Sequence, residues 1–236
     1  MTADTSRVPS ADAALARYYR FHSRIYDATR WSFLFGRQGI LRSILRAGQS
    51  PRRILEVGCG TGRNLLQLCL HFPDAEITGL DLSSEMLDIA RARTRRFGSR
   101  VEFLNESYHR PVNPVTGAYD LILFSYALSM FNPGFESAID ASHADLAPDG
   151  HVAVVDFYDT RFPWFERWMG VNHVRMKGHL MPLLQAKFEP EVDQIQSAYG
   201  GAWRYFLFVG RRITSTARSP GNIASSEYSP QVSSAR

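Results

Sequence analysis

A glycine-rich turn between an apolar run and an amphipathic run restricts the fold of this chain more than any other feature. The turn is Glu56-Val-Gly58-Cys-Gly60-Thr-Gly62, and it overlaps the apolar run 53–57. Glycine lets the backbone of such a turn pass close to a ligand, and the helix that follows presents unbonded N–H groups. Asp81 ends the next apolar run, 19 residues after Gly62, where a carboxylate can accept hydrogen bonds from both hydroxyls of a ribose. The pattern therefore predicts a strand, turn and helix that bind a nucleoside.

The spacing of the glycines separates the candidate cofactors. A dinucleotide fingerprint requires glycine at the third position of GxGxxG, and that position is Arg63 when counted from Gly58 and Gly60. A P-loop is excluded because no Gly-Lys-Ser/Thr sequence follows. A nicotinamide dehydrogenase is thus disfavoured, and a glycine-rich turn that binds no ligand is the plainest alternative.

Short apolar runs alternate with longer amphipathic runs along the chain. Strands are expected at 53–57, 76–80, 101–104, 119–124 and 151–157, and helices at 64–72, from Ser83 as N-cap, and at 135–146. This alternation predicts an α/β fold with a doubly wound, mostly parallel sheet. Further along, a helix is expected over 174–186, and strands over 191–199 and 203–212 form a hairpin at Gly200-Gly201.

The length of 236 residues suits one domain with loose ends. We expect a flexible N-terminus at 1–12, a single domain at 13–212 and a disordered, serine-rich tail at 213–236. Within the domain, the expected parts are a helical segment (13–50), a cofactor-binding core (51–157) and a C-terminal helix with the hairpin (158–212).

Cellular location and metal content follow from what the sequence lacks. No apolar run approaches the roughly 18 residues that cross a bilayer, and the polar start shows no signal-peptide core, so a cytoplasmic location is expected. Cys59 and Cys69 are expected to be reduced thiols, and no cluster of ligand residues predicts a metal site.

With the GxGxG turn after Glu56 and the distal Asp81, the chain resembles the class I S-adenosylmethionine-dependent methyltransferases over about residues 15–212. The resemblance implies a seven-stranded sheet of order 3-2-1-4-5-7-6 with the last strand antiparallel, and S-adenosyl-L-methionine as the cofactor. It also implies that the N-terminal helical segment forms a lid.

The resemblance also implies which residues bind the cofactor. The methionine and ribose portions would be lined by Gly58, Gly60 and Gly62, with Glu56 beneath them. Asp81 would hold the ribose, Leu82 would pack on the adenine, and Ser107 or Glu106 would bind the adenine amino group. Arg30 would pair with the methionine carboxylate, and Asn64 and Ser125 would complete the cofactor site.

The acceptor is expected to be an amine nitrogen. DNA and RNA amino-methyltransferases carry Asn/Asp-Pro-Pro-aromatic after the fourth strand, whereas this chain has Ser125-Tyr126, so no nucleic-acid partner is expected. The aromatic and arginine-rich segment 18–37, together with the run 125–130 and Asp156-Phe157, resembles the betaine-lipid N-methyltransferases, which methylate a diacylglyceryl-homoserine head group. Aromatic faces stabilise a quaternary ammonium. Tyr26 and Tyr126 are therefore candidate catalytic residues, and His22 is a candidate proton acceptor.

Several alternatives stay open on the acceptor side. Arg30 or Arg37 could pair with a substrate carboxylate. A net charge of +4 suits an anionic surface and a peripheral contact with the inner membrane face. Trp164 and Trp168 are expected to cover the sheet, with interfacial anchoring as the alternative. The whole protein could instead methylate a soluble amino acid, amine or phenol, or bind the cofactor without turnover.

Overall fold

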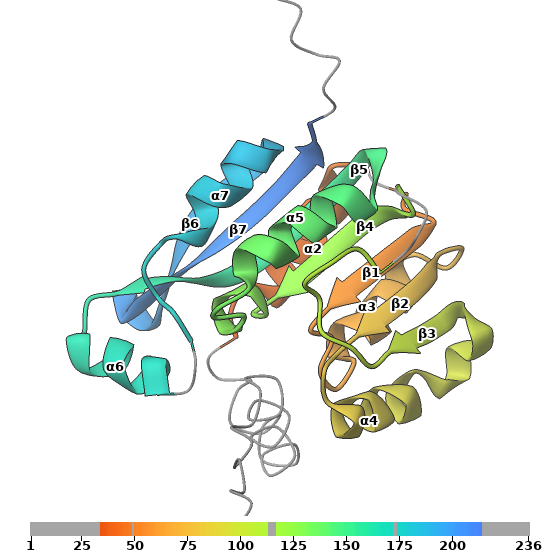
Figure 1. The fold of residues 1–236 in the computed structure, drawn as a ribbon, viewed down its shortest axis with the longest axis horizontal. Coiled ribbons are helices and arrows are strands. Elements are labelled where there is room, and N and C mark those ends of the chain that lie inside the picture. The colour runs from red at the N-terminus through yellow and green to blue at the C-terminus, as the bar shows by residue number, and fades with distance from the viewer. Residues whose placement is uncertain (1–33, 49, 113–116, 172–173, 214–236) are drawn as a thin grey trace, which may run out of the picture.

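A seven-stranded sheet between two layers of helices carries the fold (Figure 1). The computed structural model describes residues 34–48, 50–112, 117–171 and 174–213. The strand order is β3-β2-β1-β4-β5-β7-β6, in which β7 runs antiparallel to β5 and β6 and the other neighbours are parallel. The strand order and the antiparallel last strand that the family resemblance implied are confirmed.

The strands are β1 (Arg53–Val57), β2 (Glu76–Leu80), β3 (Val101–Leu104), β4 (Tyr119–Ser125), β5 (Leu146–Thr160), β6 (Phe188–Ala198) and β7 (Trp203–Arg212). The α-helices are α2 (Arg37–Arg46), α3 (Arg63–His71), α4 (Ser84–Thr94), α5 (Phe135–Asp145), α6 (Pro163–Val171) and α7 (Leu180–Lys187). Short 3-10 helices lie at η1 (Arg95–Arg100), η2 (Leu128–Met130) and η3 (Tyr199–Gly201).

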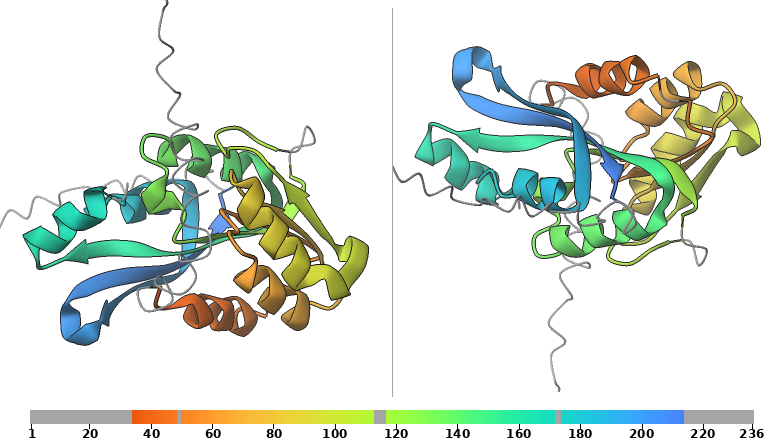
Figure 2. Two further views of the ribbon diagram at one scale, coloured as in Figure 1. Left: turned by 90° about the horizontal axis from the view of Figure 1, so that it is seen from below. Right: turned by 90° about the horizontal axis from the view of Figure 1, so that it is seen from above.

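The central strands are apolar on both faces because helices cover both sides of the sheet (Figure 2). In β1, Ile54 points into a cluster that includes residues of α2, α3 and α4. Leu55, one residue later, points into the opposite cluster with α5 and α7. Both side chains are fully buried, so β1 lies at the centre of the core and holds the turn that follows it.

Helix α4 begins where the sequence predicts. The N-cap is Ser83, whose Oγ accepts a hydrogen bond from Met86 N at 3.2 Å. The cap fixes the helix directly after Asp81, so the carboxylate and the start of α4 have defined relative positions.

Three element starts after the fourth strand were predicted wrongly. The helix expected over 174–186 begins only at Leu180, because Val174 and Met176 are buried in the core and Gly178 adopts a φ of 63°. The N–H of Gly178 donates to Tyr158 O at 2.8 Å, which holds this stretch beside the sheet instead of in a helix.

Two strands extend beyond their predicted ends. β5 begins at Leu146, where it pairs with Tyr119, five residues before its predicted start at 151. β6 begins at Phe188, which pairs with Arg212, three residues before the predicted start. The hairpin itself is confirmed, since β6 and β7 are antiparallel across η3.

The predicted flexible segment 1–12, most of the helical segment 13–50 and the tail after residue 213 lie outside the described residues. Within the described ranges, no helix is both long and apolar enough to cross a bilayer. Cys59 and Cys69 are free and buried.

Candidate cofactor and acceptor site

The glycine-rich turn lies at the carboxyl end of β1 and leads into α3. Backbone N–H groups of Gly58 and Cys59 donate to Leu80 O at 2.8 and 3.0 Å, which ties the turn to the end of β2. A Cβ on Gly58 would lie 2.8 Å from the Cβ of Ala127, so the turn packs against the chain that follows β4. The ends of three strands therefore meet around this turn, as expected at the switch point of an α/β sheet.

Gly62 serves helix packing. Its φ is 74°, and a Cβ there would lie 2.9 Å from the Cβ of Ala90 on α4. Glycine therefore permits the close approach of α3 to α4. A dinucleotide fingerprint would provide this contact one residue later, at the position that Arg63 occupies here.

Gly60 faces open space beside a carboxylate. A Cβ on Gly60 would have no neighbour within 4 Å, although its φ of 54° also favours glycine. Its N–H donates to Asp81 Oδ2 at 2.8 Å, and Ser83 N donates to Oδ1 at 2.9 Å. A carboxylate oxygen can accept more than one hydrogen bond, so these contacts are compatible with ribose hydroxyls as further donors. These contacts are compatible with a nucleoside at this turn, and its binding here stays a prediction.

Glu56 lies buried beneath the turn with 1% of its surface exposed. Asn64 Nδ2 donates to its Oε1 at 2.8 Å, and Oε2 has no hydrogen-bond partner among the described residues. Burial raises the pKa of the Glu56 carboxyl from 4.5 to about 8, and the charge of Asp81 adds to the rise. The Asn64 hydrogen bond and the positive charge of Arg37 act in the opposite direction. A cation placed next to Oε2 would relieve the cost of this buried carboxylate.

The chain around the ends of β2 and β3 forms the next part of the site. Leu82 is half-exposed, as a side chain that packs on a flat ring would be. The hydroxyl of Ser107 lies 2.9 Å from His109 Nδ1, and its predicted contact with adenine stays a prediction. Asn105 Nδ2 donates to the carbonyls of Asp81 and Leu82 at 3.0 and 2.9 Å. Asn105 was not predicted as a site residue, although its polar side chain directly after β3 could have indicated one.

Ser125 ends β4, and Tyr126 follows it directly. Ser125 is buried, and no described residue bonds to its Oγ. Tyr126 has a φ of 57°, and only 2% of its surface is exposed. Its hydroxyl donates to Phe35 O at 2.6 Å, and its ring packs edge-on against Phe157 at 4.7 Å. Tyr126 thus joins the segment before α2 to the sheet, and its predicted contact with an acceptor stays a prediction.

The remaining catalytic candidates, His22 and Tyr26, and the candidate cofactor contact Arg30 lie outside the described residues. Among the residues that are described, no group of three His, Cys, Asp or Glu side chains could hold a metal ion.

Sequence reasoning assigned no role to the side chain of Asp156 on β5. It is fully buried, and its carboxylate accepts from Ser129 N at 3.0 Å and Phe157 N at 2.8 Å. Ser129 O in turn accepts from Arg175 N at 3.0 Å. These bonds join η2, β5 and the chain before α7 at the acceptor end of the sheet.

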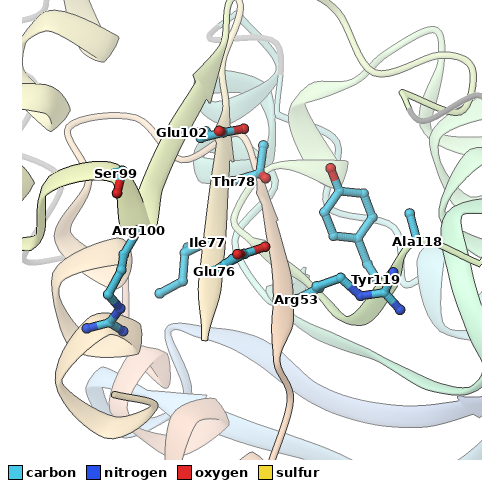
Figure 3. Close-up of a pocket in the computed structure, with 9 residues that line it drawn as sticks. All are labelled: Arg53, Glu76, Ile77, Thr78, Ser99, Arg100, Glu102, Ala118 and Tyr119. Atoms are coloured by element: carbon cyan, nitrogen blue, oxygen red, sulfur yellow. The ribbon is translucent and has the colours of Figure 1, made fainter. Parts of the chain in front are cut away.

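A separate hollow of about 250 Å³ lies at the opposite end of the sheet (Figure 3). It is lined by Arg53, Glu76 and Tyr119, which begin β1, β2 and β4, together with Thr78 and Glu102. A five-residue strand spans roughly 13 Å, so this hollow is not the site at the glycine turn.

Fold and site together define the class of this domain. A sheet of this order, three glycines after β1 and a carboxylate after β2 are the features of a class I S-adenosylmethionine-dependent methyltransferase domain. Residues 54–150 match the family model described as a methyltransferase domain.

Curated relatives match part of the chain. Demethylmenaquinone methyltransferase of Thermus thermophilus is 33% identical over 109 residues, which are 46% of this chain and 49% of that protein. Ubiquinone biosynthesis O-methyltransferase of Pectobacterium atrosepticum is 27% identical over 157 residues, covering 62% of this chain and 64% of that protein. The chain spans about half to two thirds of the length of these relatives.

Solved structures share the fold over more of the chain. The 1,6-didemethyltoxoflavin-N1-methyltransferase of Burkholderia thailandensis, with bound S-adenosylhomocysteine, has a TM-score of 0.63 and 19% identity over 90% of this chain and 94% of that one. A phosphoethanolamine N-methyltransferase of Haemonchus contortus has a TM-score of 0.70 and 14% identity over 88% of this chain and 61% of that one.

Proposed function

We propose that this protein is an S-adenosylmethionine-dependent methyltransferase that methylates an amine nitrogen of an aminolipid head group. The arrangement of Gly60, Asp81 and Glu56 carries the cofactor part of the proposal. Gly60 leaves space for the ligand, Asp81 presents acceptors for ribose hydroxyls, and Glu56 offers a buried acceptor to a cation.

The bound cofactor supplies a methyl group on a sulfonium sulfur, open to in-line attack by a lone pair. The task of the chain is to hold the acceptor amine in line with that methyl group and to exclude water. The end of β4 lies beside the glycine turn through the contact of Gly58 with Ala127. Ser125 Oγ, buried there without a partner among the described residues, is available to a ligand.

An ammonium acceptor must lose a proton before it can attack. His22 is the proposed proton acceptor, and Tyr26 the proposed aromatic contact for the quaternary ammonium product. Support for an amine acceptor comes from the resemblance of segment 18–37 to the betaine-lipid enzymes. The two structural neighbours described above are also N-methyltransferases by name.

The test uses the full chain and S-adenosylmethionine with a labelled methyl group. Candidate acceptors are diacylglyceryl-homoserine, phosphatidylethanolamine, phosphoethanolamine and a demethylated quinol, with Asp81→Asn as the matched control. Label in one, two and three steps on an aminolipid nitrogen supports the proposal. Label only on a soluble amine or on a quinol would contradict the lipid acceptor. Binding of S-adenosylhomocysteine without any transfer would identify a binding protein.

A further inference from the structure

Helix α6 has two apolar faces, and only one of them packs against the protein. Phe165 and Met169 are buried in the core. Trp164, Trp168 and Val171 are 67%, 49% and 75% exposed, and their spacing of four and three residues places them on one side of the helix. We call these three residues the α6 stripe. Two exposed tryptophans on one face need an explanation, because this large apolar side chain is highly buried on average.

The α6 stripe is held in place and cannot be covered by a simple rotation of the helix. Phe165, on the inner face, stacks on Trp203 of β7 with ring centroids 5.3 Å apart. The N–H groups of Phe165 and Glu166 both donate to Phe162 O at 3.0 Å, which fixes the start of the helix. The sequence-based expectation that Trp164 and Trp168 cover the sheet is therefore wrong, since Phe165 and Met169 do so.

The chain around the stripe is basic. Over residues 161–179 there are four arginines and lysines and one acid, Glu166. Arg161, Arg167 and Lys177 are exposed, and Arg175 is half-buried. A basic surface that also carries exposed tryptophans is complementary to an anionic bilayer, where tryptophan rings occupy the head-group region and cations meet phosphates.

The α6 stripe also lies at the acceptor end of the sheet. The N–H of Val174 donates to Met169 O, and that of Arg175 donates to Ser129 O, both at 3.0 Å. Ser129 belongs to η2, directly after β4. Figure 1 shows α6 at the same end of the sheet as the carboxyl ends of β1 and β4, and Figure 2 shows it projecting beside the tip of the β6–β7 hairpin.

We propose that the α6 stripe and its basic neighbours dock the protein on an anionic lipid bilayer. Docking there would turn the carboxyl ends of β1 and β4 toward the lipid head groups. This inference deepens the proposed aminolipid methylation and rests on it for its purpose, whereas the docking itself is measured without any methyl transfer.

The experiment is sedimentation of the full chain with vesicles of phosphatidylcholine alone and of phosphatidylcholine mixed with phosphatidylglycerol. We expect binding to the mixed vesicles that weakens with salt. The double variant Trp164→Ala/Trp168→Ala should bind at least about tenfold more weakly. Arg167→Gln/Lys177→Gln should lose about fivefold per residue on the mixed vesicles, and the loss should disappear at high salt.

Leu45→Ala/Leu70→Ala is the matched control, because these leucines are also exposed, at 38% and 52%, but lie on α2 and α3. It should bind vesicles like the unchanged protein. Affinity for S-adenosylhomocysteine, measured for every variant, should not change, and the unfolding temperature shows that each variant is folded at the temperature of the vesicle assay.

Equal vesicle binding by the tryptophan variant and the unchanged protein would overturn the proposal, as would no binding by the unchanged protein. Dimers in the ultracentrifuge that the tryptophan variant abolishes, without vesicle binding, would identify an interface between two copies instead. If the protein docks through the stripe but no aminolipid accepts a methyl group, the proposed function fails while the docking surface stands. If a short-chain aminolipid in solution is methylated without vesicle binding, the reverse holds.

Discussion

Replacing Glu56 with glutamine tests whether the buried carboxyl is protonated in the ligand-free protein and ionises when a positively charged ligand binds. Glutamine keeps the shape and can keep the acceptor for Asn64 Nδ2, but it cannot ionise. Burial raises the pKa of the Glu56 carboxyl to about 8 in the folded protein, well above the ordinary value of 4.5. The folded state therefore holds a proton that the unfolded chain releases between these two values.

The sign and size of the effect follow from this difference. Between pH 4.5 and 8 the folded state binds more protons at this position, so the stability it contributes is present below pH 4.5 and lost as the pH rises toward 8. One proton changes the free energy of unfolding by about 1.4 kcal/mol per pH unit. From pH 5.5 to 7.5, the ligand-free protein should therefore lose about 3 kcal/mol relative to Glu56→Gln.

Urea unfolding of both proteins at a series of pH values measures this slope. Because glutamine also buries an amide, only the change with pH is compared, not the absolute stability. Parallel curves would refute the assignment of a strongly raised pKa to Glu56.

Ligand binding gives an independent measurement of the same group. The ammonium of S-adenosylhomocysteine, placed near Oε2, should favour the ionised carboxylate and release close to one proton at pH 7. Calorimetry in buffers of different ionisation enthalpy counts this proton. Adenosine, which lacks the ammonium, should release none, and neither should Glu56→Gln with either ligand. Equal release by adenosine and S-adenosylhomocysteine would show that the cation does not lie beside Glu56.

Four further variants separate the roles of the neighbouring residues. Asp81→Asn weakens the acceptors of two backbone N–H groups, so the free energy of unfolding in urea should fall by about 2 kcal/mol. The affinity for S-adenosylhomocysteine should fall at least tenfold, and unchanged affinity in calorimetry would contradict the ribose contact. Gly62→Ala should cost about 3 kcal/mol from its positive φ and the clash with α4, whereas Gly60→Ala should cost about 1 kcal/mol and act mainly on ligand affinity; equal unfolding midpoints would contradict this division. Tyr126→Phe should cost about 1 kcal/mol through the lost hydrogen bond to Phe35 O, and a stability equal to that of the unchanged protein would show that this bond contributes nothing.

Most of the fold could be predicted because its determinants are local. Each central strand is a short apolar run, and Ser83 and the glycines mark the helix starts within a few residues of sequence. The stretch 174–179 was assigned to a helix because its apolar spacing resembles one. The contact of Gly178 with Tyr158 lies 20 residues away in sequence and decides the outcome. Such a tertiary contact leaves no local signal.

The residues of the candidate site also fall into two groups, those predicted from local sequence and those positioned by tertiary contacts. Glu56, Gly60 and Asp81 could be predicted as a group because the cofactor side is built from two consecutive turns after β1 and β2. The hydrogen bonds of Asn105 and Asp156 depend on how strands far apart in sequence are paired. The exposure of Trp164 could not be predicted either, because helical spacing alone does not show which face of a short apolar helix packs inward.

The family match covers the cofactor side of the candidate site better than the acceptor side. The family match ends at residue 150, so it contains the cofactor candidates from Glu56 to Ser125 but not Arg30, α6 or the chain that reaches Ser129. Relatives named for quinone methylation and neighbours named for N-methylation can therefore share the first part while their acceptors differ. Because Asp156 joins η2 to β5 and Ser129 joins η2 to Arg175, residues after 150 should contribute to acceptor specificity together with segment 18–37 and the end of β4. The α6 stripe lies in that part of the chain, outside the matched family model.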